Sequence, residues 1–194
     1  MQHASFAAMQ CPIARSLDQT GDWWSMLILR NAFLGARRFH DFEELLGIAP
    51  NTLTRRLTAL TEHGLLRRYA YTERPRRYAY ALTEKGQDFL PVLLSLAAWG
   101  NRWLAEEGVA IECVCATTGA PVEPALVDRR TGRALGPGMV ALRAGPAARR
   151  RLRKGLEAPV ILGAEGVLGG AEGVLGGAEV AAPRAVRGAA RVRA

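Results

Sequence analysis

The sequence predicts a mainly α-helical domain with one β-hairpin, of the α+β class, followed by a small β-rich appendage and a disordered C-terminal tail. Three observations indicate this class: four segments before residue 65 that begin and end like helices, a change to strand-like residues at 65–82, and a last apolar segment with helical spacing. We expect the main domain to span 11–107, the appendage 108–157 and the tail 158–194.

Residues that start and stop helices divide the beginning of the chain. Pro12 suits the first position of a helix over 12–20. Asp22 is a natural N-cap for a helix over 23–34, and Gly35 is a natural stop for it. Because 23–34 has little polar surface, we expect a buried central helix.

A second pair of helices follows. Asp41 and Glu44 have the spacing of a capping box, which predicts a short helix that ends at Gly47. Pro50 opens the next helix, and Gly64 closes it. Two short helices joined by a tight turn predict a helix-turn-helix.

The residue pattern then changes to that of a β-hairpin. Aromatic and aliphatic residues dominate 65–71 and 77–82, and the turn-forming run 72–76 separates them. Thr83 is placed to cap a last long helix, in which Pro91 introduces a kink or marks the true start.

The C-terminal part of the chain carries weaker signals. Thr-Gly pairs at 118–119 and 131–132 each precede short apolar runs, which favours a β-rich appendage. Further on, the same glycine-rich heptapeptide occurs in tandem at 164–170 and 171–177. Three glycines in each repeat oppose a stable helix, so we expect 158–194 to be disordered.

The charge distribution favours a polyanionic partner such as nucleic acid. The formal net charge is +8, and residues 51–80 contain seven arginines against two acids. A merely soluble basic protein is the alternative. The sequence shows no secretory signal pattern and no apolar run long enough to span a bilayer. Its three cysteines, an odd number, favour reduced thiols, so we expect a cytoplasmic protein without membrane contact.

A helix-turn-helix followed by a hairpin is the order of a winged helix, whose second helix reads the major groove of DNA. Leu53, Leu57 and Leu60 share one face of that second helix and are expected to anchor it. The other faces are polar, with cations available for guanine edges or phosphates. An ordinary amphipathic surface helix is the alternative. The predicted DNA-binding residues of this helix are Asn51, Thr52, Thr54, Arg55, Arg56 and Thr58.

The tip of the hairpin favours the DNA-binding interpretation. Arg74, Arg76 and Arg77 cluster there. A basic tip of this kind can enter the minor groove or contact phosphates. We therefore predict that double-stranded DNA is the partner.

Several motifs follow one another in a fixed order along the first half of the chain. They are Cys-Pro-Ile at 11–13, Gly-Asp-Trp-Trp at 21–24, Leu-Ile-Leu-Arg at 27–30, Gly-Ala-Arg-Arg-Phe at 35–39, Gly-Ile-Ala-Pro-Asn-Thr-Leu-Thr-Arg-Arg-Leu at 47–57, Leu60 with Gly-Leu-Leu at 64–66, Pro75 with Tyr-Ala-Tyr at 78–80, and Leu-Thr-Glu-Lys-Gly at 82–86. Together they resemble the HxlR-type winged-helix regulators, which are relatives of the MarR group. The resemblance covers about half of the chain, and the ordered set is far more specific than any single motif.

The resemblance implies a homodimer that binds an inverted-repeat operator, with repression as the more common outcome. It places the dimer interface on the terminal helices. One departure is Ala49, which stands where the family usually has Ser; alanine cannot cap, which costs about 1 kcal/mol of local helix stability. The implied interface residues are Leu17, Phe89, Leu93, Leu96, Trp99 and Trp103.

Two interpretations of Cys11 stay open. The helix dipole favours the thiolate form of a thiol just before a helix N-terminus, and in the resembling family a cysteine at this place often senses oxidants or electrophiles. A small apolar residue packed at the dimer seam is the alternative. Cys113 and Cys115 suggest a metal, but a zinc site needs about four ligands, so we expect no metal and no cofactor.

Two other functional classes compete with a regulator. An enzyme is disfavoured because there is no glycine-rich phosphate loop after a strand, no paired-histidine metal helix and no nucleophile elbow. A winged helix used for non-specific nucleic-acid binding or protein contact is the main alternative, which the basic tail suits. Base readout would give discrimination between DNA sequences that survives moderate salt. Binding through phosphates alone would weaken steeply and equally for all sequences as the salt concentration rises. No motif indicates a small-molecule effector.

Overall fold

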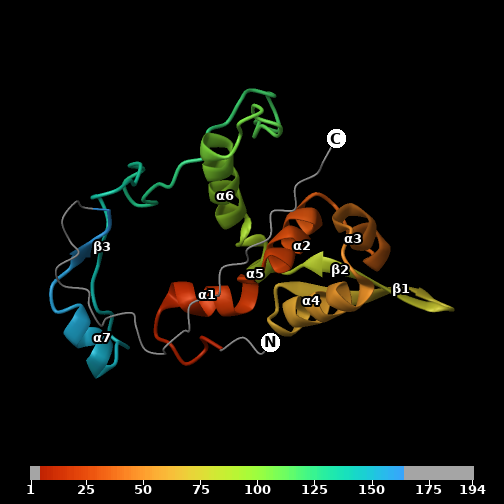
Figure 1. The fold of residues 1–194 in the computed structure, drawn as a ribbon, viewed down its shortest axis with the longest axis horizontal. Coiled ribbons are helices and arrows are strands. Elements are labelled where there is room, and N and C mark those ends of the chain that lie inside the picture. Colours follow the sequence, from red (N-terminus) through yellow and green to blue (C-terminus); the bar gives the residue numbers. More distant parts are fainter. Residues whose placement is uncertain (1–4, 164–194) are drawn as a thin grey trace, which may run out of the picture. The chain divides into compact units, whose positions relative to one another are not determined.

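The computed structural model describes residues 5–163, which divide into two compact units with a boundary between Gly136 and Pro137. The first unit has the predicted order of helices and hairpin, with one short extra helix (Figure 1). Its elements are α1 (Pro12–Thr20), α2 (Trp23–Phe33), α3 (Phe39–Leu46), α4 (Pro50–Glu62), β1 (Leu66–Glu73), β2 (Arg76–Leu82), α5 (Glu84–Gln87) and α6 (Leu90–Trp103).

The boundaries of α1, α2 and α4 follow the local chemistry of the sequence and confirm the prediction to within one residue. Pro12 and Pro50 lie in the first turns of α1 and α4. The carboxylate of Asp22 caps α2 by accepting hydrogen bonds from the backbone N–H of Ser25, at 3.1 Å, and from its hydroxyl. Gly35 follows α2 with φ of +104°, a conformation that favours glycine.

The start of α3 differs from the prediction. The helix begins at Phe39, so Asp41 lies in its third position instead of capping it. Oδ2 of Asp41 reaches back and accepts hydrogen bonds from the backbone N–H groups of Arg37, at 2.9 Å, and Arg38, at 2.8 Å. Asp41 therefore bonds to the free N–H groups from inside the first turn. The spacing of Asp41 and Glu44 predicted that Asp41 is the N-cap, and this helix start is wrong.

The core forms where α2, α3, α4 and the base of the hairpin meet. Each fully buried large apolar side chain contributes about 1.5–3 kcal/mol of transfer free energy. The cluster therefore fixes α4 on α2 and on the base of β1. Its fully buried large apolar side chains are Ile28, Leu29, Phe42, Leu53, Leu57, Leu60 and Leu66.

The prediction of a buried central helix is correct for only one side of α2. Ile28 and Leu29 are fully buried. Trp23 at the start of the helix is 74% exposed, and Leu34 just after its end is 76% exposed. The helix is apolar on nearly all sides, so its sequence could not show which side the core covers.

The hairpin of β1 and β2, called the wing from here on, is an antiparallel pair of strands with a β-bulge between Ala70 and Thr72. Only Arg74 and Pro75 lie between the strands, so the turn is shorter than the predicted run 72–76. The Thr72 hydroxyl donates a hydrogen bond of 2.7 Å to the carbonyl oxygen of Pro75, which closes the tip.

The predicted last helix is divided into α5 and α6. Thr83 caps α5: its oxygen accepts from the N–H of Gly86 at 3.1 Å, and its hydroxyl donates to the carbonyl of Gly64 at 2.6 Å. The chain leaves the helical path after one turn, and α6 begins at Leu90 with Pro91 in its first turn. Pro91 therefore marks a true helix start, which was one of the two expected outcomes.

The end of the first unit consists of turns joined by isolated β-bridges, between Val114 and Pro121 and between Val127 and Ala134. These are single bridges outside any strand, so the β-rich character of the appendage stays a prediction. Among the described residues, no helix is both long and apolar enough to cross a membrane.

The second unit contains a two-stranded sheet and one helix. β3 (Ala141–Leu142) pairs with β4 (Val160–Ile161), and α7 (Arg150–Gly155) lies between them in sequence. The sequence pattern did not predict α7, because a basic helix without an apolar stripe has no hydrophobic period. β4 lies inside the range 158–194 that was expected to be disordered, of which the structure describes residues 158–163; the tandem repeat at 164–177 lies outside the described residues.

Candidate nucleic-acid interface

The exposed face of α4 is the first part of the candidate interface. Leu53, Leu57 and Leu60 have no exposed area, and they hold the opposite face of α4 on the core. Ala49 precedes the helix in an extended conformation and makes no side-chain cap, as its lack of an acceptor requires. Of the six residues predicted for DNA binding, four are exposed on this face: Asn51, Thr54, Arg55 and Thr58.

The other two predicted residues, Thr52 and Arg56, are half-buried on the flanks of α4. Nε of Arg56 lies 3.1 Å from Oδ1 of Asp22, and because its N–H is not aligned for a hydrogen bond, the contact is an ion pair. Asp22 is also the cap of α2, so this ion pair joins the start of α2 to the middle of α4. The charge of Arg56 is therefore partly neutralised inside the domain, unlike that of Arg55.

The tip of the wing is the second part of the candidate interface. The predicted residues Arg74, Arg76 and Arg77 are all exposed there. Within the described part of the chain, none of the three forms an ion pair. The tip thus presents three positive charges that are free to contact an anion, which suits a phosphate or a narrow minor groove.

A cluster of arginines and tyrosines beside the wing was missed by the sequence analysis. The guanidinium carbon of Arg38 lies 4.9 Å from the ring centroid of Tyr71, and that of Arg68 lies 3.5 Å from the ring centroid of Tyr78. The hairpin register, which sets Arg68 opposite Tyr80, was the available signal for part of this cluster. The contact between Arg38 and Tyr71 depends on the bulge and on the loop before α3, which no residue spacing reveals.

The six residues predicted for a dimer interface fall into two groups. Phe89 and Leu93 are half-buried and pack on the core of the domain. The other four are exposed, and α6 as a whole has no buried residue. An apolar helix with so little covering is typical of an interaction surface. The exposed fractions are 47% for Leu17, 52% for Leu96, 54% for Trp99 and 62% for Trp103.

The three cysteines have different surroundings. Cys11 is the half-buried N-cap of α1 and makes no side-chain hydrogen bond to cap it. Sγ of Cys115 lies 3.1 Å from Oγ1 of Thr117, and hydrogen bonds from Thr117 and Thr118 lower the pKa of the Cys115 thiol to about 6. The sequence context of Cys115 suggested only a metal ligand, together with Cys113. Among the described residues, no group of three His, Cys, Asp or Glu side chains is placed to hold a metal ion.

Comparisons with known proteins assign this arrangement of helices and wing to a family. Residues 20–108 match the model of the HxlR-like helix-turn-helix family. An uncharacterized HTH-type transcriptional regulator of Mycobacterium tuberculosis is 36% identical over 141 residues, which are 72% of this chain and 89% of that relative. The chain belongs to the HxlR-like helix-turn-helix family. A second relative with the description of an uncharacterized HTH-type transcriptional regulator, from Synechocystis sp., is 38% identical over 112 residues, or 57% of this chain and 82% of the relative.

Two solved structures extend the similarity. PA1374 of Pseudomonas aeruginosa, described as a candidate transcription factor, is 48% identical, with a TM-score of 0.55. PA1607, described in the same way, is 35% identical, with a TM-score of 0.66. Each comparison covers 74% of this HxlR-like chain and 99% of the other. The chain is therefore a winged helix-turn-helix transcriptional regulator, and the family and fold predicted from its sequence are confirmed.

Proposed function

We propose that this HxlR-like chain is a cytoplasmic homodimer that binds inverted-repeat operators sequence-specifically and represses transcription. The observation that carries the proposal is the polar exposed face of α4, whose backbone is held by three fully buried leucines. Base edges in the major groove are read by hydrogen-bonding side chains on a helix of fixed position. A surface that binds only phosphates would need neither that fixed helix nor uncharged donors and acceptors.

The contacts divide into base readout and phosphate binding. An asparagine amide can pair with adenine through two hydrogen bonds, and an arginine fork can do the same with guanine, so we assign Asn51 and Arg55 to base edges, with Thr52 beside them. The wing residues Arg74, Arg76 and Arg77 are assigned to phosphates or to the adjacent minor groove. The remaining predicted contacts of α4 are Thr54, Arg56 and Thr58.

The dimer is proposed from the uncovered apolar side chains of α1 and α6. Leu17, Leu96, Trp99 and Trp103 would be removed from water between two copies of the chain. A two-fold axis between the copies would direct their α4 helices to successive major grooves, about 34–36 Å apart. An operator that matches this symmetry is an inverted repeat.

Oxidant control is proposed for Cys11. This residue occupies the N-cap position of α1, which also carries Leu17 of the proposed interface. A polar or bulky group added to the thiol would therefore act at the start of an interface helix and change the spacing of the two α4 helices. If Cys11 instead serves only to pack the dimer seam, its replacement by serine will leave the oxidant response unchanged.

Selection of bound duplexes from a random pool, with the purified full chain, tests the proposal. We expect enrichment of an inverted-repeat motif whose recovery falls when the protein is treated with a thiol oxidant. In the Cys11→Ser variant the motif should remain and the oxidant effect should disappear. Recovery of duplexes without any common motif would overturn sequence-specific readout and favour non-specific nucleic-acid binding.

A further inference from the structure

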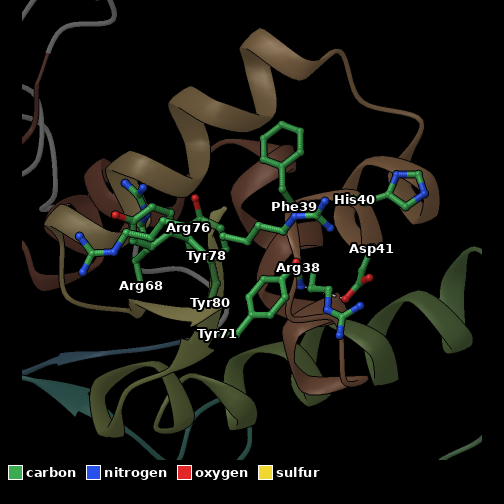
Figure 2. A pocket seen from close by; sticks show the side chains of 10 residues that line it. Arg38, Phe39, His40, Asp41, Arg68, Tyr71, Arg76, Tyr78 and Tyr80 are labelled. Carbon is green, nitrogen blue, oxygen red and sulfur yellow. Dashed lines mark hydrogen bonds between the residues drawn. The ribbon is translucent and has the colours of Figure 1, made fainter. Parts of the chain in front are cut away.

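A cleft of about 510 Å³ lies between the first turn of α3 and the wing, and the proposed function leaves part of it without a role. Figure 2 shows its labelled side chains, which come from Arg38–Asp41 on one side and from the two strands on the other. The two sides are fixed to each other, because the N–H of Tyr80 donates a hydrogen bond of 2.7 Å to the carbonyl of Arg37. A β-bridge between Arg38 and Ala79 adds to this connection.

Positive charge dominates the cleft. Its lining includes four arginines, and Asp41 is its one carboxylate. That carboxylate already accepts two backbone hydrogen bonds at the start of α3. In the part of the chain that the structure describes, none of the four arginines forms an ion pair. The four are Arg38, Arg68, Arg76 and Arg77.

Aromatic rings hold two of these guanidinium groups in place. Arg68 lies over the ring of Tyr78, which also has Arg76 at 5.8 Å, and Arg38 lies over the ring of Tyr71. A guanidinium stacked on a ring keeps its N–H donors at its edge, where they remain available to a ligand. Because its orientation is already restricted, it loses less freedom when it binds an oxyanion. These stacks prepare the cleft for a phosphate-like group.

We propose that this cleft binds a backbone phosphate of DNA, with Arg38 and Arg68 as the contacting residues and Tyr71 and Tyr78 as positioning residues. The inference rests on the proposed DNA-binding function. In a helix-turn-helix the first helix crosses the DNA backbone while the second enters the major groove. Here α3 is that first helix, and its N-terminal turn forms one side of the cleft. Arg38 and Arg68 belong neither to α4 nor to the wing tip, whereas Arg76 and Arg77, which also line the cleft, are the tip residues already assigned to DNA.

The test compares Arg68→Ala with Arg67→Ala in the full chain. The two residues are adjacent in β1 and lose the same charge when replaced. Arg67 is also stacked on a tyrosine, with its guanidinium carbon 5.2 Å from the ring centroid of Tyr69. Unlike Arg68 and Tyr78, Arg67 and Tyr69 do not line the cleft. Arg67→Ala therefore controls for net charge and for loss of a stacked pair. Arg38→Ala repeats the test from the other side of the cleft.

Binding of one duplex that contains the selected motif and one scrambled duplex is measured by fluorescence anisotropy over a series of salt concentrations. We expect Arg68→Ala and Arg38→Ala to weaken both duplexes alike, by roughly tenfold. The slope of log Kd against log salt should fall by about 1 in each variant, as for loss of one phosphate contact. Tyr78→Leu should weaken binding without any change of charge, whereas Tyr78→Phe, which keeps the ring, should bind like the unaltered chain.

The proposal is overturned if Arg68→Ala and Arg38→Ala bind both duplexes as Arg67→Ala does, with the same salt slope. Unchanged duplex affinity together with loss of inorganic pyrophosphate binding, measured by calorimetry, would also overturn it and assign the cleft to a small phosphorylated ligand. Failure of the proposed function looks different: the unaltered chain would bind both duplexes equally. In that case the cleft variants would still report whether the cleft contacts the DNA backbone.

Discussion

At the scale of single residues, Arg55 and Arg56 are adjacent but have different physical roles. Arg55 is exposed, so its five donors are available to a guanine edge. Arg56 is half-buried beside the Asp22 carboxylate, and its removal would leave that carboxylate without a positive partner. We therefore expect loss of Arg55 to act on DNA recognition, and loss of Arg56 to act also on the packing of α2 against α4.

The thiol of Cys115 supplies a prediction about pH. Its pKa is lowered to about 6 by hydrogen bonds from Thr117 and Thr118, so the reactive thiolate should predominate at neutral pH. In a variant with Cys11 and Cys113 replaced by serine, the rate of alkylation by iodoacetamide should rise with pH and reach half its maximum near pH 6. Thr117→Val should move that midpoint upward. A midpoint near the ordinary thiol value of 9.0 would contradict this account.

At the scale of elements, Asp41 makes the stability of α3 depend on pH. Its pKa lies below the ordinary value of 3.8, because the backbone N–H groups of Arg38 and Arg37 bond to the ionised carboxylate. The stabilisation is therefore complete above the ordinary pKa and is lost as the pH falls through the lowered one. We expect Asp41→Ala to reduce the free energy of unfolding by about 1 kcal/mol at neutral pH.

Urea unfolding of the unaltered chain and of Asp41→Ala, from neutral pH down through the acid range, measures this effect. The difference in unfolding free energy between the two should shrink as the carboxyl group of Asp41 becomes protonated. An equal difference at every pH would show that Asp41 stabilises α3 by a means other than its ionised cap.

The elements also show what residue patterns can and cannot predict. Pro12, Asp22 and Pro50 act through the backbone immediately around them, so three helix starts were predictable from the sequence. The start of α3 was not predictable, because Asp41 lies inside the helix and its carboxylate accepts hydrogen bonds from the N–H groups of the residues before the helix. Likewise Thr83 was identified as a cap, but the break after α5 depends on where the chain must turn to form α6.

The candidate site follows the same division. Three buried leucines at helical spacing define the hidden face of α4, so its exposed residues could be predicted without a structure. The tip arginines were predictable because they surround a turn. The stacks of Arg38 on Tyr71 and Arg68 on Tyr78 required the strand register, the bulge and the path of the chain before α3. Side chains that meet across elements are set by tertiary geometry, which spacing in one segment does not contain.

At the scale of the whole molecule, the proposed binding to an inverted repeat depends on dimerisation through α1 and α6. Trp99 is 54% exposed on a helix with no buried residue, so a charge there should leave the domain folded and disrupt the apolar interface. We expect Trp99→Glu to elute as a monomer in size-exclusion chromatography with light scattering, and to lose most of its affinity for an inverted repeat.

Trp23→Glu is a matched control for that prediction, because Trp23 is even more exposed, at 74%, and lies outside the proposed interface. This variant should remain dimeric. If Trp99→Glu keeps the mass of a dimer, or if both variants dissociate equally, the interface does not lie on α6 as proposed.

The most direct test of sequence-specific recognition by α4 is the ratio of Kd values for a scrambled duplex and for the selected motif, at moderate salt. Arg55→Ala should lower this ratio by roughly tenfold or more, because one bidentate base contact contributes about 1–3 kcal/mol of discrimination. Arg76→Ala should weaken both duplexes alike and leave the ratio unchanged. Equal losses in both variants on both duplexes would contradict the account, because α4 would then contribute no base readout.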